Sequence, residues 1–299
     1  MLCAPAYPVH HDSDNPGKRG QHSPAPAPGE SSSRDHLALI AGDRSEAPAY
    51  TGARHTGVSL TFLRLFIVVV STILLGSLGI VLCLLVPGGA ALMPVARLWS
   101  WLILKTFRVR SRAVRHPEFS HSRPCVYVAN HQSQFDIPAL VLAMPTDFRI
   151  VAKRELLFIP IFGWALWLAG FIFIDRSDRD RAIRRLDRVV RVIRRGTSVV
   201  VFAEGTRSPD GRLLPFKKGG FILAIKSGVP IVPVSIRGGR DILPKGSLHV
   251  RRGTIDVVFG APIPTSPYTL ETKEALIGAV RDRIAAGLGC LPAKPNGIN

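Results

Sequence analysis

The sequence predicts an α/β fold in which helices flank a central, mostly parallel sheet. Short apolar runs typical of buried strands, such as 125–129 and 198–203, alternate with longer segments of helical character. This alternation is typical of a layered α/β domain. Of the 299 residues, 46% are hydrophobic, which is enough for one substantial core with appendages.

The chain divides by composition into four segments. Its first 57 residues are rich in Pro, Ser, Gly and Ala and lack hydrophobic periodicity, so they cannot bury enough surface to offset the entropy of ordering. No apolar run follows the initiator methionine, so we expect no signal peptide. The predicted segments are a disordered tail (1–57), a membrane-anchoring helical segment (58–108), the folded domain (109–290) and a flexible C-terminal tail (291–299).

The anchoring segment contains two apolar stretches. The first, Leu65 to Val86, has 22 residues without a charge, and as a helix it would extend about 33 Å, enough to cross a hydrocarbon core. A buried core helix is the alternative, but nothing in the stretch marks a polar face. The second, Ala90 to Leu104, includes Arg97, Trp99 and Trp101, a pattern that suits a helix in the membrane interface.

Basic residues are concentrated after the anchor and in one later helix. Five of them follow the second apolar stretch: Lys105, Arg108, Arg110, Arg112 and Arg115. The positive-inside rule then places the folded domain on the cytoplasmic face of the membrane, where anionic headgroups would attract a chain of net charge +18. The segment 179–195 predicts an amphipathic helix with eight arginines. That helix has two open interpretations, a membrane-facing surface or a solvated face packed on the sheet.

A histidine and an aspartate follow the first buried strand. His131 and Asp136 are five positions apart, directly after the run 125–129. An imidazole titrates near neutral pH and can accept a proton from a hydroxyl, while a carboxylate on its other nitrogen fixes the tautomer. The alternative is structural, because polar residues at a strand end often form turns or cap helices.

A second polar group follows the next buried strand. Glu204, Gly205, Thr206 and Arg207 come directly after 198–203. Glycine permits close backbone approach, threonine adds a hydroxyl, and arginine offers a planar fork for phosphate. The alternative is an ordinary turn with a surface arginine.

Together these blocks resemble the glycerophospholipid acyltransferase family. Four motifs of that family occur in order between about residues 110 and 265: His131 to Asp136, Lys153-Arg154-Glu155-Leu156 closing on 171–176, 202–208 continuing through 214–219, and Val229 to Val234. The chain departs from the family at Ala203, where proline often precedes the Glu-Gly pair. This departure removes no reactive group.

The resemblance implies a fold, a reaction and a set of roles. The domain would be a layered acyltransferase domain preceded by a membrane helical hairpin. A lysolipid hydroxyl would attack the thioester of acyl-CoA or of an acyl carrier protein, with His131 as general base and Asp136 orienting it. Glu204, Gly205, Thr206 and Arg207 would form the acceptor site, with Arg207 on the phosphate and Lys153 as a further phosphate contact.

The stretch Leu156 to Ile174 has 19 uncharged residues, enough to pass a simple test for a membrane span. A crossing there would separate His131 from Arg207, which the proposed chemistry needs together. Pro160 and two glycines also interrupt it, so we expect a hydrophobic helix and strand that line an acyl pocket or dip into one leaflet.

The remaining runs predict strands near 231–237 and 254–259 and helices near 216–227 and 270–286. The four cysteines, Cys3, Cys83, Cys125 and Cys290, show no pairing pattern, which favours a reducing compartment.

Competing catalytic patterns are absent from the sequence. It has no nucleophile elbow, zinc-protease helix motif, Walker loop or dinucleotide fingerprint. Ser133 is two residues from His131 and suits a turn hydrogen bond better than a nucleophile's role. His10, His11, His116 and His121 have no companion ligands for a metal, so we expect no metal and no cofactor beyond the acyl-CoA or acyl carrier protein co-substrate.

The sequence therefore predicts a membrane-bound acyltransferase that makes phosphatidic acid from lysophosphatidic acid, with membrane lipids as further partners. Glycerol 3-phosphate, another lysophospholipid or a lyso-aminolipid remain alternative acceptors. A basic nucleic-acid-binding protein tethered to a membrane is the alternative from another class, but the chain has no recognised binding module, so we expect no nucleic-acid partner. Oligomeric state, acyl-chain length and donor carrier stay open.

Overall fold

The computed structural model describes residues 56–86, 89–119, 124–174 and 179–289, with side chains described from Leu60 and again from Leu186 after a gap at 175–185. The chain divides into two units, Met1–Ser59 and Leu60–Asn299. Only the start of one helix is described in the first unit. The predicted tails at 1–57 and 291–299 thus lie almost entirely outside the described residues.

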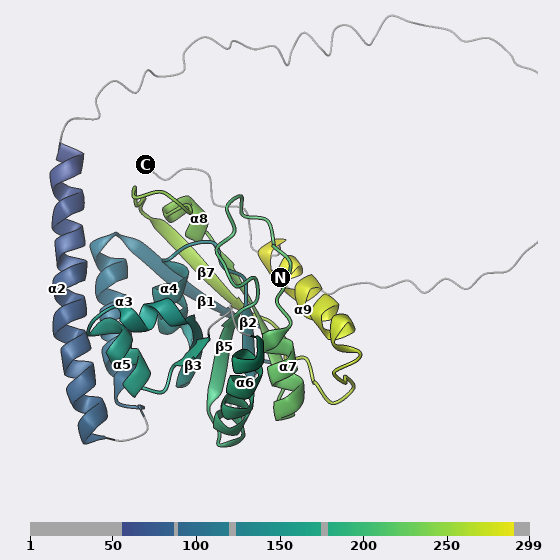
Figure 1. The fold of residues 1–299 in the computed structure, drawn as a ribbon. Coiled ribbons are helices and arrows are strands. Elements are labelled where there is room, and N and C mark those ends of the chain that lie inside the picture. The colour runs from purple at the N-terminus through teal and green to yellow at the C-terminus, as the bar shows by residue number, and fades with distance from the viewer. Residues whose placement is uncertain (1–55, 87–88, 120–123, 175–178, 290–299) are drawn as a thin grey trace, which may run out of the picture. The chain divides into compact units, whose positions relative to one another are not determined.

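A seven-stranded sheet forms the centre of the second unit (Figure 1). Its strands lie in the order β1-β7-β6-β2-β5-β3-β4, and β6 with β7 is the one antiparallel pair. The mostly parallel sheet that the sequence predicts is therefore confirmed. The strands are β1 (Val109–Arg115), β2 (Val126–Ala129), β3 (Phe148–Lys153), β4 (Ile172–Ile174), β5 (Ser198–Phe202), β6 (Ile231–Arg237) and β7 (Gly253–Phe259).

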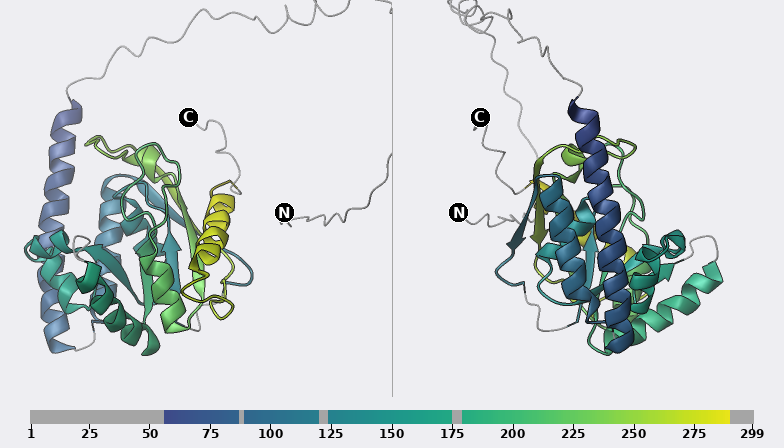
Figure 2. Two further views of the ribbon diagram at one scale, coloured as in Figure 1. Left: turned by 45° about the vertical axis from the view of Figure 1, so that its right-hand side comes forward. Right: turned by 90° about the vertical axis from the view of Figure 1, so that its left-hand side faces the viewer.

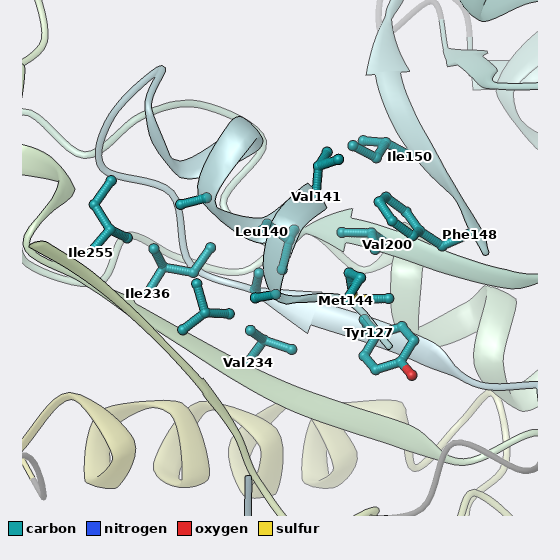
Figure 3. Packing of buried hydrophobic residues seen from close by; sticks show 14 of the residues in the cluster. Tyr127, Leu140, Val141, Met144, Phe148, Ile150, Val200, Val234, Ile236 and Ile255 are labelled. Carbon is teal, nitrogen blue, oxygen red and sulfur yellow. The ribbon is translucent and has the colours of Figure 1, made fainter. Parts of the chain in front are cut away.

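Helices cover both faces of this sheet, and each face has its own core. Along β2, Tyr127 and Ala129 face one core whereas Val126 and Val128 face the other, as the alternation of side chains in a strand requires. The first core packs α3 (Leu92–Thr106) and α4 (Asp136–Ala143) on the sheet. Figure 3 shows Leu140 and Val141 of α4 among the strand residues of this core. The second packs α6 (Arg179–Arg194), α7 (Gly219–Ser227) and α9 (Lys273–Gly289).

The elements near the C-terminus follow the sequence closely. The strand expected at 231–237 is β6 with the same bounds, and the helix expected at 216–227 ends at the same residue but begins three residues later. Gly228 follows that helix with φ 71°, a left-handed conformation that glycine adopts without strain and that ends a helix.

The predicted anchoring segment forms two helices of different character. The first is α2 (Thr56–Leu85) (Figure 2). Its 26 residues from Leu60 to Leu85 form a helical stretch that is long and apolar enough to cross a membrane. Large apolar side chains such as Phe62, Leu74 and Leu84 are exposed along it. The second, α3, buries Met93, Leu104 and neighbours in the first core. The domain boundary that the sequence predicts at residue 109 therefore lies between α3 and the rest of the first core, although α3 contributes residues to that core.

The basic cluster expected beside the membrane lies partly in the sheet. Arg110, Arg112 and Arg115 belong to β1, which pairs with β7. Arg112 Nε donates to Asp256 Oδ1 at 2.7 Å, and Arg115 Nη2 donates to the carbonyl of Ala143. These two arginines thus have bonding partners within the folded unit.

The 19 uncharged residues from Leu156 to Ile174 form no long helix. They comprise most of a 3₁₀ helix η1 (Arg154–Phe158), then α5 (Phe162–Leu168) and the short strand β4, which pairs with β3. Ile161 between them has φ 65°, so the chain turns sharply after Pro160. Each element is too short to cross a hydrocarbon core.

Candidate active site

The candidate site lies where three neighbouring parallel strands end. The strands β5, β2 and β6 are adjacent and parallel, so their carboxyl ends share one edge of the sheet. His131 follows β2, Glu204 follows β5, and Gly239 follows β6 by two residues. Ligands of parallel α/β sheets bind at this edge, outside the strand ends.

The His131 ring is held on one nitrogen and on one face. Its Nδ1 lies 3.0 Å from Asp136 Oδ2, and its ring stacks on Phe202 with centroids 4.1 Å apart. The Asp136 side chain is fully buried, whereas 14% of the His131 side chain is exposed. With Nδ1 engaged by the carboxylate, Nε2 is the nitrogen left for chemistry.

Backbone groups fix the Asp136 carboxylate. Its Oδ2 accepts hydrogen bonds from the N–H groups of Gln132 and Ser133, each at 2.7 Å. The residues between the histidine and the aspartate therefore form a tight turn around the carboxylate. This turn is the reason that a separation of five residues brings the two side chains into contact.

The loop after β5 binds the His131 backbone at both of its polar groups. The His131 N–H donates to Glu204 Oε1 at 3.1 Å, and the Ser208 N–H donates to the His131 carbonyl at 2.8 Å. The two blocks that the sequence places 73 positions apart are thus joined directly. A shift of either loop would move the imidazole.

Glu204 is placed inside the protein. Only 2% of it is exposed, and its Oε2 accepts a second hydrogen bond from the Leu214 N–H at 3.2 Å. Burial raises the pKa of its carboxyl, although the hydrogen bonds from His131 and Leu214 oppose this shift. Both carboxylate oxygens accept hydrogen bonds from backbone N–H groups, and the acceptor contact that the sequence predicts for Glu204 stays a prediction.

The other predicted acceptor residues are at or near the surface. Gly205 has φ 69°, which turns the chain so that Thr206 is exposed and Arg207 half-buried. Lys153, at the end of β3, pairs with Glu155 at 2.9 Å, and both side chains are more than half exposed. Such an exposed pair contributes little free energy, so a phosphate can compete for Lys153.

Two polar residues of the first block have structural partners that the sequence alone did not assign. The buried Asn130 side chain donates to the Ile236 carbonyl at 2.9 Å and accepts from the Ile236 N–H at 2.7 Å, linking β2 to β6. The buried Ser133 hydroxyl donates to the Leu243 carbonyl at 2.9 Å. The sequence signal that was available for Asn130 is its position as a polar residue directly after a wholly apolar strand.

An apolar cavity of about 110 Å³ lies among the helices α2, α3, α4 and α5. Its lining includes Leu75 of α2, Ala96 of α3, Ile137 and Val141 of α4, and Phe162 and Leu166 of α5. One lining residue, Ile137, directly follows Asp136 in the sequence, but Asp136 and His131 do not line the cavity themselves. The stretch 156–174, expected to line an acyl pocket, contributes part of its wall.

Within the described ranges, no group of three or more His, Cys, Asp or Glu side chains is arranged to hold a metal ion. His116 is exposed in a turn, with its Nδ1 accepting from the Glu118 N–H. His10, His11 and His121 lie outside the described residues. The expectation that no metal or further cofactor takes part stays a prediction.

Comparisons with known proteins place this geometry in a family context. The family model described as Acyltransferase matches residues 111–237. A chloroplastic 1-acyl-sn-glycerol-3-phosphate acyltransferase of Brassica napus is 36% identical over 195 residues, 65% of this chain and 55% of the relative. The human 1-acyl-sn-glycerol-3-phosphate acyltransferase beta is 36% identical over 198 residues, which cover 65% of this chain and 71% of the relative.

A solved structure agrees with these sequence matches. The crystal structure of the 1-acyl-sn-glycerophosphate (LPA) acyltransferase from Thermotoga maritima has a TM-score of 0.65 and 27% identity, and the match covers 80% of this chain and 98% of that one. The chain spans little more than half the length of the Brassica napus relative, at 55%.

Proposed function

Because this chain belongs to the family of the 1-acyl-sn-glycerol-3-phosphate acyltransferases, we propose that it transfers a fatty acyl group from a thioester to the free hydroxyl of lysophosphatidic acid. The product would be phosphatidic acid, and the thioester that of acyl-CoA or of an acyl carrier protein. The activity for which these relatives are named and the geometry at the ends of β2 and β5 support this proposal.

His131 acts as the general base in the proposed mechanism. Its Nε2 takes the proton of the acceptor hydroxyl as the hydroxyl oxygen attacks the thioester carbon, and Asp136 stabilises the imidazolium that forms. The new carbon–oxygen bond replaces the carbon–sulfur bond, and the thiol leaves with the proton that the imidazolium returns. No covalent acyl-enzyme is needed, because the thioester is already activated.

The acceptor binds through its phosphate. Arg207 offers two parallel N–H donors, and Thr206 offers a hydroxyl from the same exposed loop. Lys153 adds a second charge once it leaves Glu155. Fixing the phosphate fixes the hydroxyl relative to His131, which lowers the entropic part of the barrier.

The acyl chain occupies the apolar cavity, and α2 attaches the enzyme to its membrane. Leu75 and Gly76 of α2 line the cavity, so an acyl chain there would lie against the helix that also contacts lipid. We propose that the catalytic unit faces the cytoplasm, on the basis of Lys105 in the last turn of α3 and the arginines that follow this helix.

One observation supports the proposal above the others. The His131–Asp136 pair is bound through the His131 backbone to the loop that carries Arg207. A general base and a phosphate-binding arginine are therefore held at a fixed separation. Attack on the thioester by the hydroxyl of a phosphorylated acceptor requires such a fixed separation.

The test is thiol release from oleoyl-CoA by the detergent-purified protein, with and without lysophosphatidic acid. We expect release to require the acceptor and to fall by about three orders of magnitude or more in His131→Ala, because the base is lost. His116→Ala is the matched control, since the His116 side chain is exposed and its Nδ1 accepts from the Glu118 N–H instead of contacting Asp136. Near-normal turnover by His131→Ala would exclude His131 as the base.

A further inference from the structure

The segment after β6 forms a third side of the site. It begins with the short helix α8 (Gly239–Ile242) and continues through Leu243 to Lys245. A Cβ atom on Gly239 would overlap Asp136 Oδ1, so the backbone of this glycine lies directly against the catalytic carboxylate. The Leu243 carbonyl accepts the hydrogen bond from Ser133. Two points of contact therefore hold the segment against the turn between His131 and Asp136.

This attachment positions Lys245 beside the predicted acceptor loop. Its Nζ donates to the Arg207 carbonyl at 3.1 Å and to Thr206 Oγ1 at 3.4 Å. An ammonium group has three donors, so one remains after these two contacts. Thr206 accepts from the lysine, and its own hydroxyl proton is then free to point elsewhere.

A second cation lies against the loop that Lys245 contacts. Arg240 of α8 donates through Nε to the Pro209 carbonyl at 3.4 Å, so it lies against the same loop. The neighbouring carboxylate of Asp210 accepts from Ser208 Oγ and from the Arg212 N–H instead. Among the residues that the structure describes, no carboxylate forms an ion pair with Lys245, and its charge is available to an anion.

We propose that Lys245 is a further acceptor-binding residue, which together with Arg207 selects a phosphate monoester over a phosphate diester. The inference rests on the proposed function and deepens it. A monoester carries a charge of about −1.5 to −2 at neutral pH, whereas a diester such as lysophosphatidylglycerol carries a single charge. A second cation beside Arg207 therefore favours the monoester more strongly.

The test compares two acceptors in the full-length, detergent-purified enzyme. In Lys245→Met we expect the KM for lysophosphatidic acid to rise about tenfold, the loss expected for one charge-assisted hydrogen bond near the surface. The kcat and the KM for oleoyl-CoA should change by less than about twofold, because a uniform loss of acceptor binding leaves kcat unchanged. Transfer to lysophosphatidylglycerol should change much less, so that the preference for the monoester falls.

Three further variants separate charge from structure. Lys245→Arg keeps the charge and should retain most of the preference, and Arg207→Ala should raise the same KM at least as much. Lys226→Met is the matched control, because Lys226 is also a lysine near the surface, but its ammonium pairs with Asp187 of α6 and not with the loop after β5. Equal losses with both acceptors in Lys245→Met would mean that Lys245 only supports the loop, and would overturn the proposal.

A binding measurement keeps this inference separate from the proposed activity. Titration calorimetry with lysophosphatidic acid in detergent, without an acyl donor, requires no turnover. Weaker binding by Lys245→Met than by Lys226→Met supports the inference even if no acyl transfer is seen. Unchanged binding in Lys245→Met, or an absence of binding by the unmodified protein, contradicts it.

Discussion

The buried carboxylate of Glu204 connects the two halves of the candidate site, which are the loops after β2 and β5. Its oxygens accept hydrogen bonds from the His131 and Leu214 N–H groups, so it holds His131, the proposed base, and the following loop together without facing solvent. We therefore regard Glu204 as a positioning residue. Burial raises the free energy of its ionised form, so the contribution of Glu204 to stability depends on pH and can be measured.

Glu204→Gln tests this role through stability. The raised pKa means that the folded state binds the Glu204 proton more tightly than the unfolded chain does. Its contribution to stability is then greatest at low pH and is lost as pH rises from about 4.3 through the folded pKa. Relative to the Gln variant, we expect the unmodified protein to lose thermal stability across that window, measured as paired unfolding midpoints in detergent.

A second carboxyl provides a control of opposite sign. Hydrogen bonding with Lys218 lowers the pKa of the exposed Glu274. Its small contribution is therefore present at neutral pH and lost as pH falls, so Glu274→Gln should show the reverse trend. A midpoint difference for Glu204→Gln that does not vary with pH would contradict the buried, titrating carboxylate.

From the sequence we did not predict β1, α4, β3 or α8, and α8 is the one that bears most on the candidate site. Its four residues, Gly239–Ile242, are too few to show helical periodicity, and a glycine pair such as Gly238-Gly239 is typical of a turn. Its importance comes from long-range packing against Asp136, which no local pattern encodes. By contrast, β2 and, after Ser198, β5 are apolar because helices cover both their faces, and such strands are visible as continuous apolar runs.

Gly239→Ala examines how closely α8 must approach the dyad. The added methyl group would overlap Asp136 Oδ1, so the carboxylate must move away from its bonds to His131 and the turn. We expect kcat to fall about tenfold to a hundredfold, because misplacement by about 1 Å has effects of this size, in a protein that still unfolds cooperatively. The measurement is kcat with lysophosphatidic acid beside the unfolding midpoint.

Gly219→Ala is the control for this substitution. It also adds a methyl group near the start of a helix, but no atom lies within 4 Å of the new Cβ. This variant should retain full kcat and gain slightly in stability, since alanine favours a helix. Full activity in Gly239→Ala would show that the close approach of α8 is not needed for catalysis.

At the scale of the whole molecule, α2 and the catalytic unit share one cavity. The sequence indicates that both α2 and α3 are apolar, but composition cannot tell a lipid-exposed helix from one that packs on a sheet. The structure distinguishes them by contact, since α3 is buried among core residues whereas α2 exposes most of its large side chains. A membrane helix that forms one wall of an acyl site would couple chain selection to the anchor.

Ala96→Leu tests whether this shared cavity holds the acyl chain. Ala96 lines the cavity of about 110 Å³ from α3, and leucine would shorten this cavity while preserving helix propensity. We expect kcat/KM for oleoyl-CoA to fall about tenfold while that for decanoyl-CoA changes little, because a shortened cavity excludes only the longer chain. Ala286→Leu, at an exposed position of α9, should leave both values unchanged. An equal fall in kcat/KM with both donors would instead indicate general damage to the fold. It would contradict the proposal that the cavity selects the acyl chain.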